Sequence, residues 1–350
     1  MNTLKNLISS FLLIITCLSC SKQLDPRIET VKAELNSAVC VTIYGNILDE
    51  GGSAVIERGF CWGLNPNPSI SDNYVKSDFG LGEFSTQICN LDLVKTYYFR
   101  TYAVNAKGTF FGKVMNFNIL ELMGGGTFVD VRDNHQYHYL PIGTQTWMME
   151  NLAYMPAVSS VSTGSDTEKH YYVYGYNGTI VTDAKEEDNY TTYGVLYNWP
   201  ASMDGASSST SVPSGVQGIC PQGWHLPSDA EWTVLTDFLT NNGYGYDGSG
   251  DDIGKSMAAL SGWTTFGFAG TIGNDQGSNN LSGFTALPGG FRNYLYGRFY
   301  NLGYDAYFWS ASENDTPDAW YRILYYDRYG VGRYYSNRSH GFSVRCLKDN

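Results

Sequence analysis

The chain is 350 residues long, a length that predicts two domains on the usual scale of about 150 residues each. Its formal net charge of -12 argues against nucleic acid as a partner, because phosphate binding requires a basic patch. The composition includes 39 glycines and 28 tyrosines with few long periodic stretches, which favours sheet and ordered loop over long helices.

The first 25 residues predict an export signal with a lipid anchor. Lys5 precedes the apolar run 12–15, and Leu18-Ser19-Cys20 follows. This run is too short to cross a bilayer as a helix, which needs about 20 apolar residues. In bacterial lipoproteins such a pattern is cut before the cysteine, so we expect a signal peptide over 1–19, acyl chains such as palmitate on Cys20, and a tether over 20–25. The alternative is an ordinary signal peptide with an incidental cysteine.

The predicted anchor sets the expected location. The protein is expected in the cell envelope, bound to a membrane by its lipid, and specifically at the outer membrane. Which face of that membrane it occupies stays open, since Ser21–Asp25 holds a single acidic residue. An exported compartment permits disulfides.

Residues 26–119 alternate between apolar and polar side chains. Val39, Val41 and Ile43 fall on one face, and turn clusters such as Asp49-Glu50-Gly51-Gly52 separate the alternating runs. Short alternating strands at this spacing predict an all-β antiparallel sandwich. Together with the run ERGFCWG at 57–63, the segment resembles the fibronectin type III-like modules of exported Bacteroidetes proteins.

Residues 120–126 break this pattern and end in three glycines, which have too much backbone freedom for a strand interior. We therefore expect a glycine-rich linker there. The second domain follows over 127–350. Asp133-Asn134 predicts a turn between two short strands, and Ser228 with Glu231 predicts a capping box at the start of a helix. A second, shorter helix is expected to contain Ile253, Met257 and Leu260.

Five motifs of the second domain follow one another along the chain: IGTQTWMMENL (142–152), CPQGWHLPS (220–228), GFTALPGGFR (283–292), FWSASE (308–313) and GFSVRC (341–346). In this order they resemble the Fibrobacter succinogenes major paralogous domain over about 220 residues, a family without a defined activity to transfer. The segment Trp224–Trp232 is also similar to a stretch of the sulfatase-modifying, formylglycine-generating enzymes, which implies an α+β, C-type-lectin-like fold.

The resemblance bears on the cysteines. C-type-lectin-like domains have a long disulfide that ties the start of the helix to the end of the chain, which implies a Cys220–Cys346 bridge. Cys40, Cys61 and Cys89 are an odd set, so at least one is expected to be free or paired between chains. Buried thiols are the favoured interpretation for this set.

The sequence offers little support for an enzyme. A nucleophile elbow and a zinc-binding HExxH helix are both missing, and His225 is expected to be a packed residue. The two cysteines of the second domain are assigned to structure, whereas formylglycine-generating enzymes use a close cysteine pair in catalysis. The remaining enzyme hypotheses are descent from that lineage, or a hydrolase that uses Glu313 and Asp315.

Aromatic residues interleaved with polar ones over the last fifty residues favour a binding role. Sugars stack on aromatic faces while carboxylates, amides and guanidinium groups meet their hydroxyls. The alternative is that most of these rings fill the interior. No cofactor is expected; the alternative is a calcium ion bound through 274–276 or Asn314-Asp315. The candidate ligand-binding residues are Trp309, Glu313, Asp315, Trp320, Arg322 and Tyr325.

The expected function is therefore a non-enzymatic envelope lipoprotein. It displays a C-type-lectin-like module on a fibronectin type III-like stalk, for adhesion to a glycan or to an envelope or host protein. The alternatives are an enzyme of the formylglycine-generating lineage or a hydrolase, and a structural component of the envelope.

Overall fold

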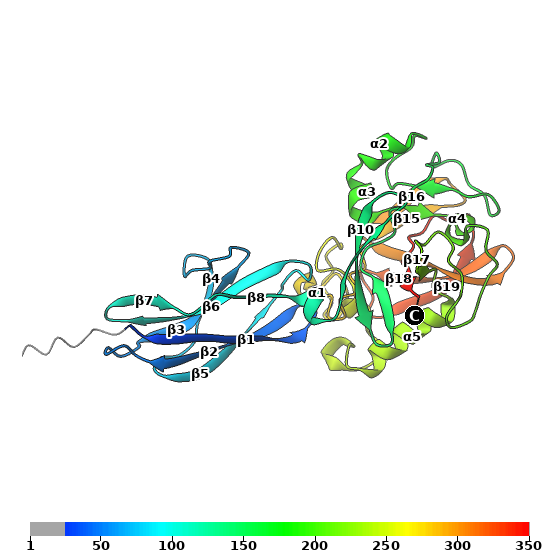
Figure 1. The fold of residues 1–350 in the computed structure, drawn as a ribbon. Coiled ribbons are helices and arrows are strands. Elements are labelled where there is room, and N and C mark those ends of the chain that lie inside the picture. The colour runs from blue at the N-terminus through cyan, green and yellow to red at the C-terminus, as the bar shows by residue number, and fades with distance from the viewer. Residues whose placement is uncertain (1–24, 350) are drawn as a thin grey trace, which may run out of the picture.

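The computed structural model describes residues 25–349, and the predicted signal 1–19 and lipidation site Cys20 lie outside that range. Within it, the chain forms a slender N-terminal part, the stalk (27–118), and a broader C-terminal part, the head (126–348) (Figure 1). The structure is predominantly β. Of the helices among residues 25–349, none has the length and apolar character needed to span a membrane.

The stalk consists of two antiparallel sheets packed face to face. One has the order β1-β2-β5 and the other β4-β3-β6-β7, with β8 also paired to β6. Alternation along β2 buries Val41 and Ile43 against Phe60 and Phe99 of the second sheet, which is the pattern a sandwich requires. The strands are β1 (Arg27–Ser37), β2 (Cys40–Asp49), β3 (Glu57–Gly63), β4 (Asn73–Lys76), β5 (Gly82–Cys89), β6 (Thr96–Asn105), β7 (Gly108–Phe111) and β8 (Met115–Asn118).

The stalk cysteines depart from the favoured interpretation. Cys40 lies directly opposite Cys89 in the β2–β5 ladder, and the two form a disulfide with an S–S distance of 2.06 Å. The interpretation as buried thiols is wrong for this pair, because strand register brings together residues 49 apart in sequence. Cys61 is free and buried, as expected for at least one member of the odd set.

The segment expected to be a glycine-rich linker is packed against both parts. Helix α1 (Ile119–Leu122) begins at Asn118, whose side chain caps it, and buries Ile119 and Leu120. Gly125 lies so close to Leu120 that a Cβ there would come within 2.3 Å of the leucine Cδ1. The glycine therefore serves close packing here, and one hydrophobic core runs from the stalk into the head.

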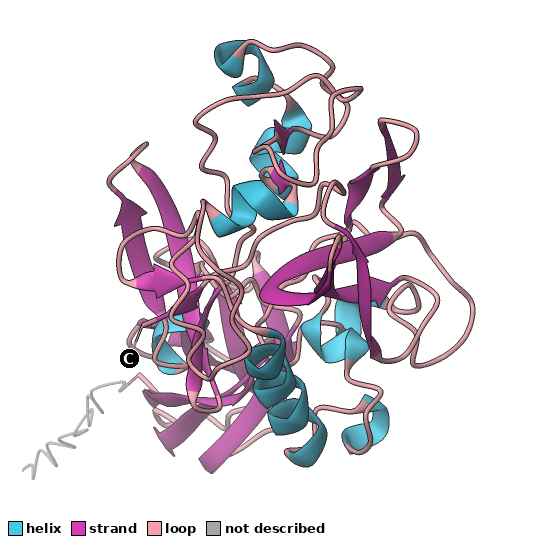
Figure 2. Ribbon diagram, turned by 90° about the vertical axis from the view of Figure 1, so that its right-hand side faces the viewer, coloured by secondary structure: helices cyan, strands magenta, loops and turns pink. Residues whose placement is uncertain are grey.

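The head contains two larger sheets, short helices and long loops (Figure 2). One sheet has the order β14-β20-β11-β10-β9, the other β16-β15-β17-β18-β19, and β12 pairs with β13. The strands are β9 (Gly126–Asp130), β10 (His135–Ile142), β11 (Gln145–Met148), β12 (Tyr171–Tyr172), β13 (Leu196–Tyr197), β14 (Trp224–His225), β15 (Gly289–Asn293), β16 (Arg298–Leu302), β17 (Asp305–Asp315), β18 (Asp318–Tyr325), β19 (Val331–Asn337) and β20 (Leu347–Lys348). The helices are α2 (Val181–Lys185), α3 (Asp188–Tyr193), α4 (Trp199–Met203), α5 (Asp229–Asn241), α6 (Gly254–Met257), and the 3₁₀ turns Tyr246–Gly248 and Gln276–Ser278.

Local signals in the head are confirmed where they are strongest. The Ser228 side chain accepts from the Glu231 amide while the Glu231 side chain accepts from the Ser228 amide, which is the predicted capping box of α5. Asn134 adopts a positive φ of 59° in the turn between β9 and β10, a conformation that asparagine tolerates. The shorter helix exists as α6, but it is shorter than expected: it contains Met257, Ile253 is its N-cap residue, and Leu260 lies beyond its end.

The Cys220–Cys346 disulfide is confirmed, with an S–S distance of 2.04 Å. Cys220 precedes β14 and Cys346 precedes β20, and these two strands pair with each other. The bridge therefore ties the approach to α5 to the last strand of the chain. His225 of β14 is buried between Glu231 and Asp349, as expected for a packed residue.

Candidate functional site

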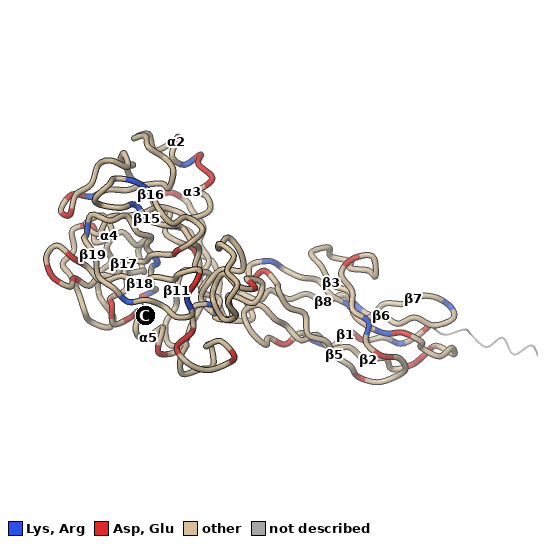
Figure 3. The backbone as a smooth tube through the Cα atoms, turned by 180° about the vertical axis from the view of Figure 1, so that it is seen from behind, with Lys and Arg blue, Asp and Glu red and all other residues tan. Residues whose placement is uncertain are grey.

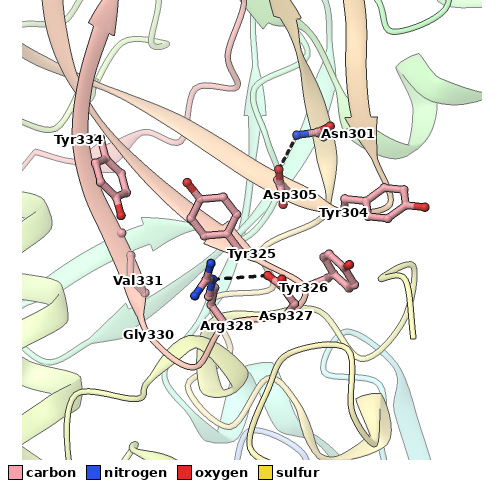
Figure 4. Close-up of a pocket in the computed structure, with 11 residues that line it drawn as sticks. Asn301, Tyr304, Asp305, Tyr325, Tyr326, Asp327, Arg328, Gly330, Val331 and Tyr334 are labelled. Atoms are coloured by element: carbon pink, nitrogen blue, oxygen red, sulfur yellow. Dashed lines mark hydrogen bonds and ion pairs between the residues drawn. The ribbon is translucent and has the colours of Figure 1, made fainter. Parts of the chain in front are cut away.

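A concave surface of the head combines tyrosine rings with carboxylates. This aromatic–carboxylate groove has a volume of about 690 Å³. Its lining comes from the end of β16, the start of β17, the turn after β18 and the start of β19 (Figure 4). The lining residues are Asn301, Tyr304, Asp305, Tyr325, Tyr326, Asp327, Arg328, Gly330, Val331, Gly332 and Tyr334.

Two turns meet to form this groove because β17 and β18 are paired. Asp305 lies opposite Tyr325 in the ladder, and the Tyr326 amide donates to the Tyr304 carbonyl at 2.9 Å. Asn301, with φ 64°, reverses the chain ahead of Tyr304. The strand register therefore fixes the positions of the groove residues.

Asp305 is the buried carboxyl of the groove, with 5% of the residue exposed. Burial raises its pKa, and this effect outweighs the opposing hydrogen bonds from the Tyr307 hydroxyl at 3.0 Å and the Asn301 amide at 2.6 Å. Asp327 raises the pKa further by charge repulsion. The carboxyl is thus held rigidly at the floor, with its hydrogen-bonding capacity set by neighbouring side chains.

The tyrosines supply ring faces at the rim of the groove. Tyr304 and Tyr326 meet edge to face with ring centroids 5.1 Å apart. Tyr304 is 45% exposed and Tyr334 is 49% exposed, so both rings are accessible from solvent. Burial raises the pKa of Tyr325 to about 12, so its hydroxyl stays protonated to a higher pH than that of an ordinary tyrosine. Figure 4 shows Tyr334 of β19 next to Tyr325 at the end of the neighbouring strand β18.

Only Tyr325 of the predicted ligand-binding residues lines this groove. Trp309 is fully buried, donates its Nε1 hydrogen to the Tyr197 carbonyl at 2.8 Å, and packs on Phe342. Because a ring without exposed surface does not stack on a ligand from solvent, the assignment of Trp309 as a ligand residue is wrong. Its neighbours along β17 are buried on both sides, a pattern that alternation does not anticipate.

Arg322 also lies in the interior and is 2% exposed. Its guanidinium pairs with Asp229 at the first turn of α5 and donates to the Thr233 hydroxyl at 3.0 Å. The ligand role predicted for Arg322 is therefore replaced by an ion pair that holds α5 on β18. Arg333 joins the same carboxylate at 2.7 Å.

Glu313, Asp315 and Trp320 lie at the opposite end of the β17–β18 ladder from the groove. Glu313 faces Ala319 and Asp315 faces Asp318 in that ladder, whereas the groove begins where Asp305 faces Tyr325. Glu313 pairs with Arg338. The Trp320 ring is covered by Arg333, with the guanidinium carbon 3.8 Å from the ring centroid. The structure therefore separates these three residues from Tyr325.

The loop considered for calcium holds a lysine ammonium. The Nζ of Lys255 donates to the carbonyls of Asn274 at 2.5 Å and Asp275 at 3.2 Å, and to Asn279 Oδ1 at 2.8 Å. Lys255 is 6% exposed, and burial lowers its pKa. The Gln276 amide is engaged with the Trp263 backbone. The oxygens of this loop thus coordinate a cation that belongs to the chain itself.

Asp305 and Asn301 are the groove residues that the sequence analysis missed. Asp305 lies inside the aromatic-rich C-terminal segment, directly after Tyr304, but it belongs to no motif of its own. A usable signal exists in the segment YNLGYD, where Asn301 and Gly303 mark a turn directly ahead of an apolar strand.

The Fibrobacter succinogenes major domain model matches residues 140–348. The curated proteins contain no match to the chain. Among solved structures, the twitchin kinase region from C. elegans matches at 19% identity over 28% of this chain and 16% of that chain, with a TM-score of 0.19. An overlap this small carries no argument about the fold.

Proposed function

The chain belongs to the Fibrobacter succinogenes major domain family, and on that premise we propose that it is a lipid-anchored envelope protein whose head binds a glycan in the aromatic–carboxylate groove. The observation that carries the proposal is the combination of exposed tyrosine rings with the buried, hydrogen-bonded Asp305 in one concavity. Rings stack on the apolar faces of sugars, and carboxyl, amide and phenol groups bond to their hydroxyls.

The charge of the groove narrows the class of glycan. Two carboxyls, Asp305 and Asp327, face one guanidinium from Arg328. An acidic sugar would meet like charge at the floor, whereas a neutral or amino sugar would not. We therefore propose a neutral or amino-sugar-containing glycan rather than a uronate or sialylated one.

The remaining parts of the proposal concern anchor and architecture. Acylation of Cys20 would hold the stalk at the outer membrane, and the disulfides Cys40–Cys89 and Cys220–Cys346 support an oxidising, exported location. The two-sheet stalk supports a fibronectin type III-like assignment. The long disulfide in front of α5 supports a C-type-lectin-like head.

The proposal is tested by screening the mature full-length chain on a glycan array, followed by calorimetry with the best ligand. Replacing Tyr304→Ala or Tyr334→Ala is expected to weaken binding about tenfold, because a lost ring stack and its burial are worth on the order of 1 to 2 kcal/mol. Tyr296→Ala is the matched control, since Tyr296 is 69% exposed in the turn between β15 and β16 and lies outside the groove.

Two results would contradict this proposal. An array without binders, with partners recovered only by protein pull-down from envelope extract, would favour a protein ligand or a structural role. A bound glycan that is recovered shortened or modified would favour the enzyme alternative. Loss of that turnover in Asp305→Asn would then place the reaction in the groove.

A further inference from the structure

Apolar side chains are exposed at the end of the stalk that lies farthest from the head. Phe79 is 74% exposed, Ile56 68%, Leu81 54% and Leu48 38%. These four residues define the stalk base. Exposed apolar residues occur singly on most surfaces, but several on adjacent segments indicate a contact surface.

Backbone pairing brings these segments to one end. Ile47 pairs with Ile28 of β1 on one side and with Gly82 of β5 on the other, which places Leu48 and Leu81 at the end of the sheet where β1 begins. The Gly80 amide donates to the Val55 carbonyl at 3.1 Å, which brings the loop carrying Phe79 next to Ile56. A separate small core containing Ile47, Val55 and Ala103 lies beneath them.

A buried arginine holds the loop in this position. Arg58 is 4% exposed and donates to the carbonyls of Leu81 and Gly82, each at 2.9 Å, and to Asp78 at 2.6 Å. Its acceptors belong to the loop that presents Phe79 and Leu81. The exposed apolar side chains are thus mounted on a fixed loop.

The stalk base is also where the chain enters the stalk. Arg27, the first residue of β1, pairs with Asp49, the residue after Leu48. Cys20 is five residues before Asp25, and five residues span at most about 18 Å when fully extended. An acyl chain on Cys20 therefore keeps the stalk base within reach of the bilayer surface, while the head lies at the opposite end (Figure 1).

Several of the charges near the base are paired with an opposite charge. Acidic and basic residues both occur along the stalk (Figure 3), and Asp49 and Glu50 follow Leu48 as consecutive acids. Glu57 pairs with Lys76 at 2.8 Å, and Asp78 pairs with Arg58. Exposed aliphatic and aromatic side chains suit the boundary between headgroups and acyl chains.

We propose that Leu48, Ile56, Phe79 and Leu81 insert into the interfacial layer of the membrane that holds Cys20, so that the stalk stands on the bilayer at a defined angle. This inference rests on the proposed lipid anchor but goes beyond it. An anchor alone leaves the stalk free to tilt, whereas a second contact at its base restricts the orientation of the head and its groove.

The test uses the acylated full-length chain in vesicles of phosphatidylethanolamine and phosphatidylglycerol. An environment-sensitive fluorophore is attached at Phe79→Cys, in a Cys61→Ala background that removes the free thiol. The matched control carries it at Leu295→Cys, which replaces a residue 66% exposed in the head. Lipids with a nitroxide near the top of the acyl chain are expected to quench the position 79 probe about twofold or more, and to leave the position 295 probe unchanged, because the nitroxide acts only at close range within the interface.

The outcomes distinguish membrane insertion of the stalk base from lipid anchoring at Cys20. Mass spectrometry of Cys20 and flotation with the vesicles test the anchor alone, and their failure would overturn the proposed lipoprotein. Acylated chain that floats while the position 79 probe escapes quenching overturns the inference and leaves the anchor intact. A shifted emission without lipid quenching, with cross-links between copies at position 79, also overturns it and identifies the base as an interface between copies.

Discussion

The stalk and the head reach stability in different ways. The stalk buries aliphatic and aromatic side chains between two sheets, and its buried polar residues are few, chiefly Arg58, Thr101 and Asn105. The head buries a much larger polar set that joins its loops, including Asn151, Asn198, His225, Glu231, Lys255, Arg292, Arg322 and Arg345. A sandwich is specified by apolar alternation, whereas a loop-rich core must satisfy its own backbone carbonyls with side-chain donors.

The largest losses of stability are expected from two separate variants, one without the disulfide of the head and one without the disulfide of the stalk. Cys220→Ala/Cys346→Ala opens a loop with a separation of 126 residues, and Cys40→Ala/Cys89→Ala one of 49. The chain-entropy relation predicts losses of about 5 and 4 kcal/mol in the free energy of unfolding. Urea unfolding monitored by tryptophan fluorescence reports on the head, which holds every tryptophan except Trp62. An equal loss from the head in both variants would show that the two parts unfold as one unit.

Arg345→Met tests the polar core of the head. The side chain is fully buried and donates to the carbonyls of Met148, Phe284 and Thr285 and to the Asn151 amide oxygen. Without the guanidinium these acceptors lack donors, so we expect a loss of about 4 kcal/mol in the head's unfolding free energy. Burial lowers the pKa of Arg345 to about 9. A loss below about 1 kcal/mol in urea unfolding would indicate that methionine packing compensates.

The difference between the apolar sandwich of the stalk and the loop-rich, polar core of the head decides which features the sequence predicts. Alternation around Val41 and Ile43 predicts the sandwich, and the Ser228 capping box predicts α5, because both signals are local in sequence. The Cys40–Cys89 pair depends on strand register, and the floor position of Asp305 depends on the meeting of two turns. Trp309 and Arg322 were misassigned because β17 and β18 are covered on both faces, so alternation does not separate exposed from buried residues.

We expect acid to destabilise the head because His340 becomes protonated. The stalk (27–118) contains no histidine and so lacks this contribution. His340 is buried against Phe342, and desolvation lowers its pKa to about 4. A depressed histidine pKa means that the folded state resists protonation, so stability present above pH about 6.5 is lost as the pH falls toward 4, by roughly 3 kcal/mol.

His340→Gln should flatten that acid dependence of the head's unfolding free energy, whatever constant cost the lost ring contact adds. His225→Gln is the control, because the pKa of His225 is shifted in the opposite direction to that of His340. Desolvation lowers the His225 pKa, but hydrogen bonds to Glu231 and Asp349 outweigh it and raise the pKa overall. Its contribution is therefore present below pH about 6.5 and lost as the pH rises through the raised folded value. An unchanged slope in His340→Gln would contradict the assignment.

Arg58→Met is expected to cause the smallest loss in unfolding free energy. It is the stalk counterpart of Arg345→Met in the head. Both arginines are buried and donate to backbone carbonyls, but Arg58 also pairs with Asp78, whose side chain is 62% exposed. When the Arg58 guanidinium is removed, water can reach Asp78 and the surface loop 80–82, whereas the acceptors of Arg345 stay enclosed. We therefore expect a loss of about 2 kcal/mol in the stalk, measured by urea unfolding with circular dichroism. Because the same loop presents Phe79 and Leu81, the variant should also lose the lipid quenching expected at position 79. Quenching that persists after the stalk loses this stability would mean that membrane contact needs only apolar side chains and not a fixed loop.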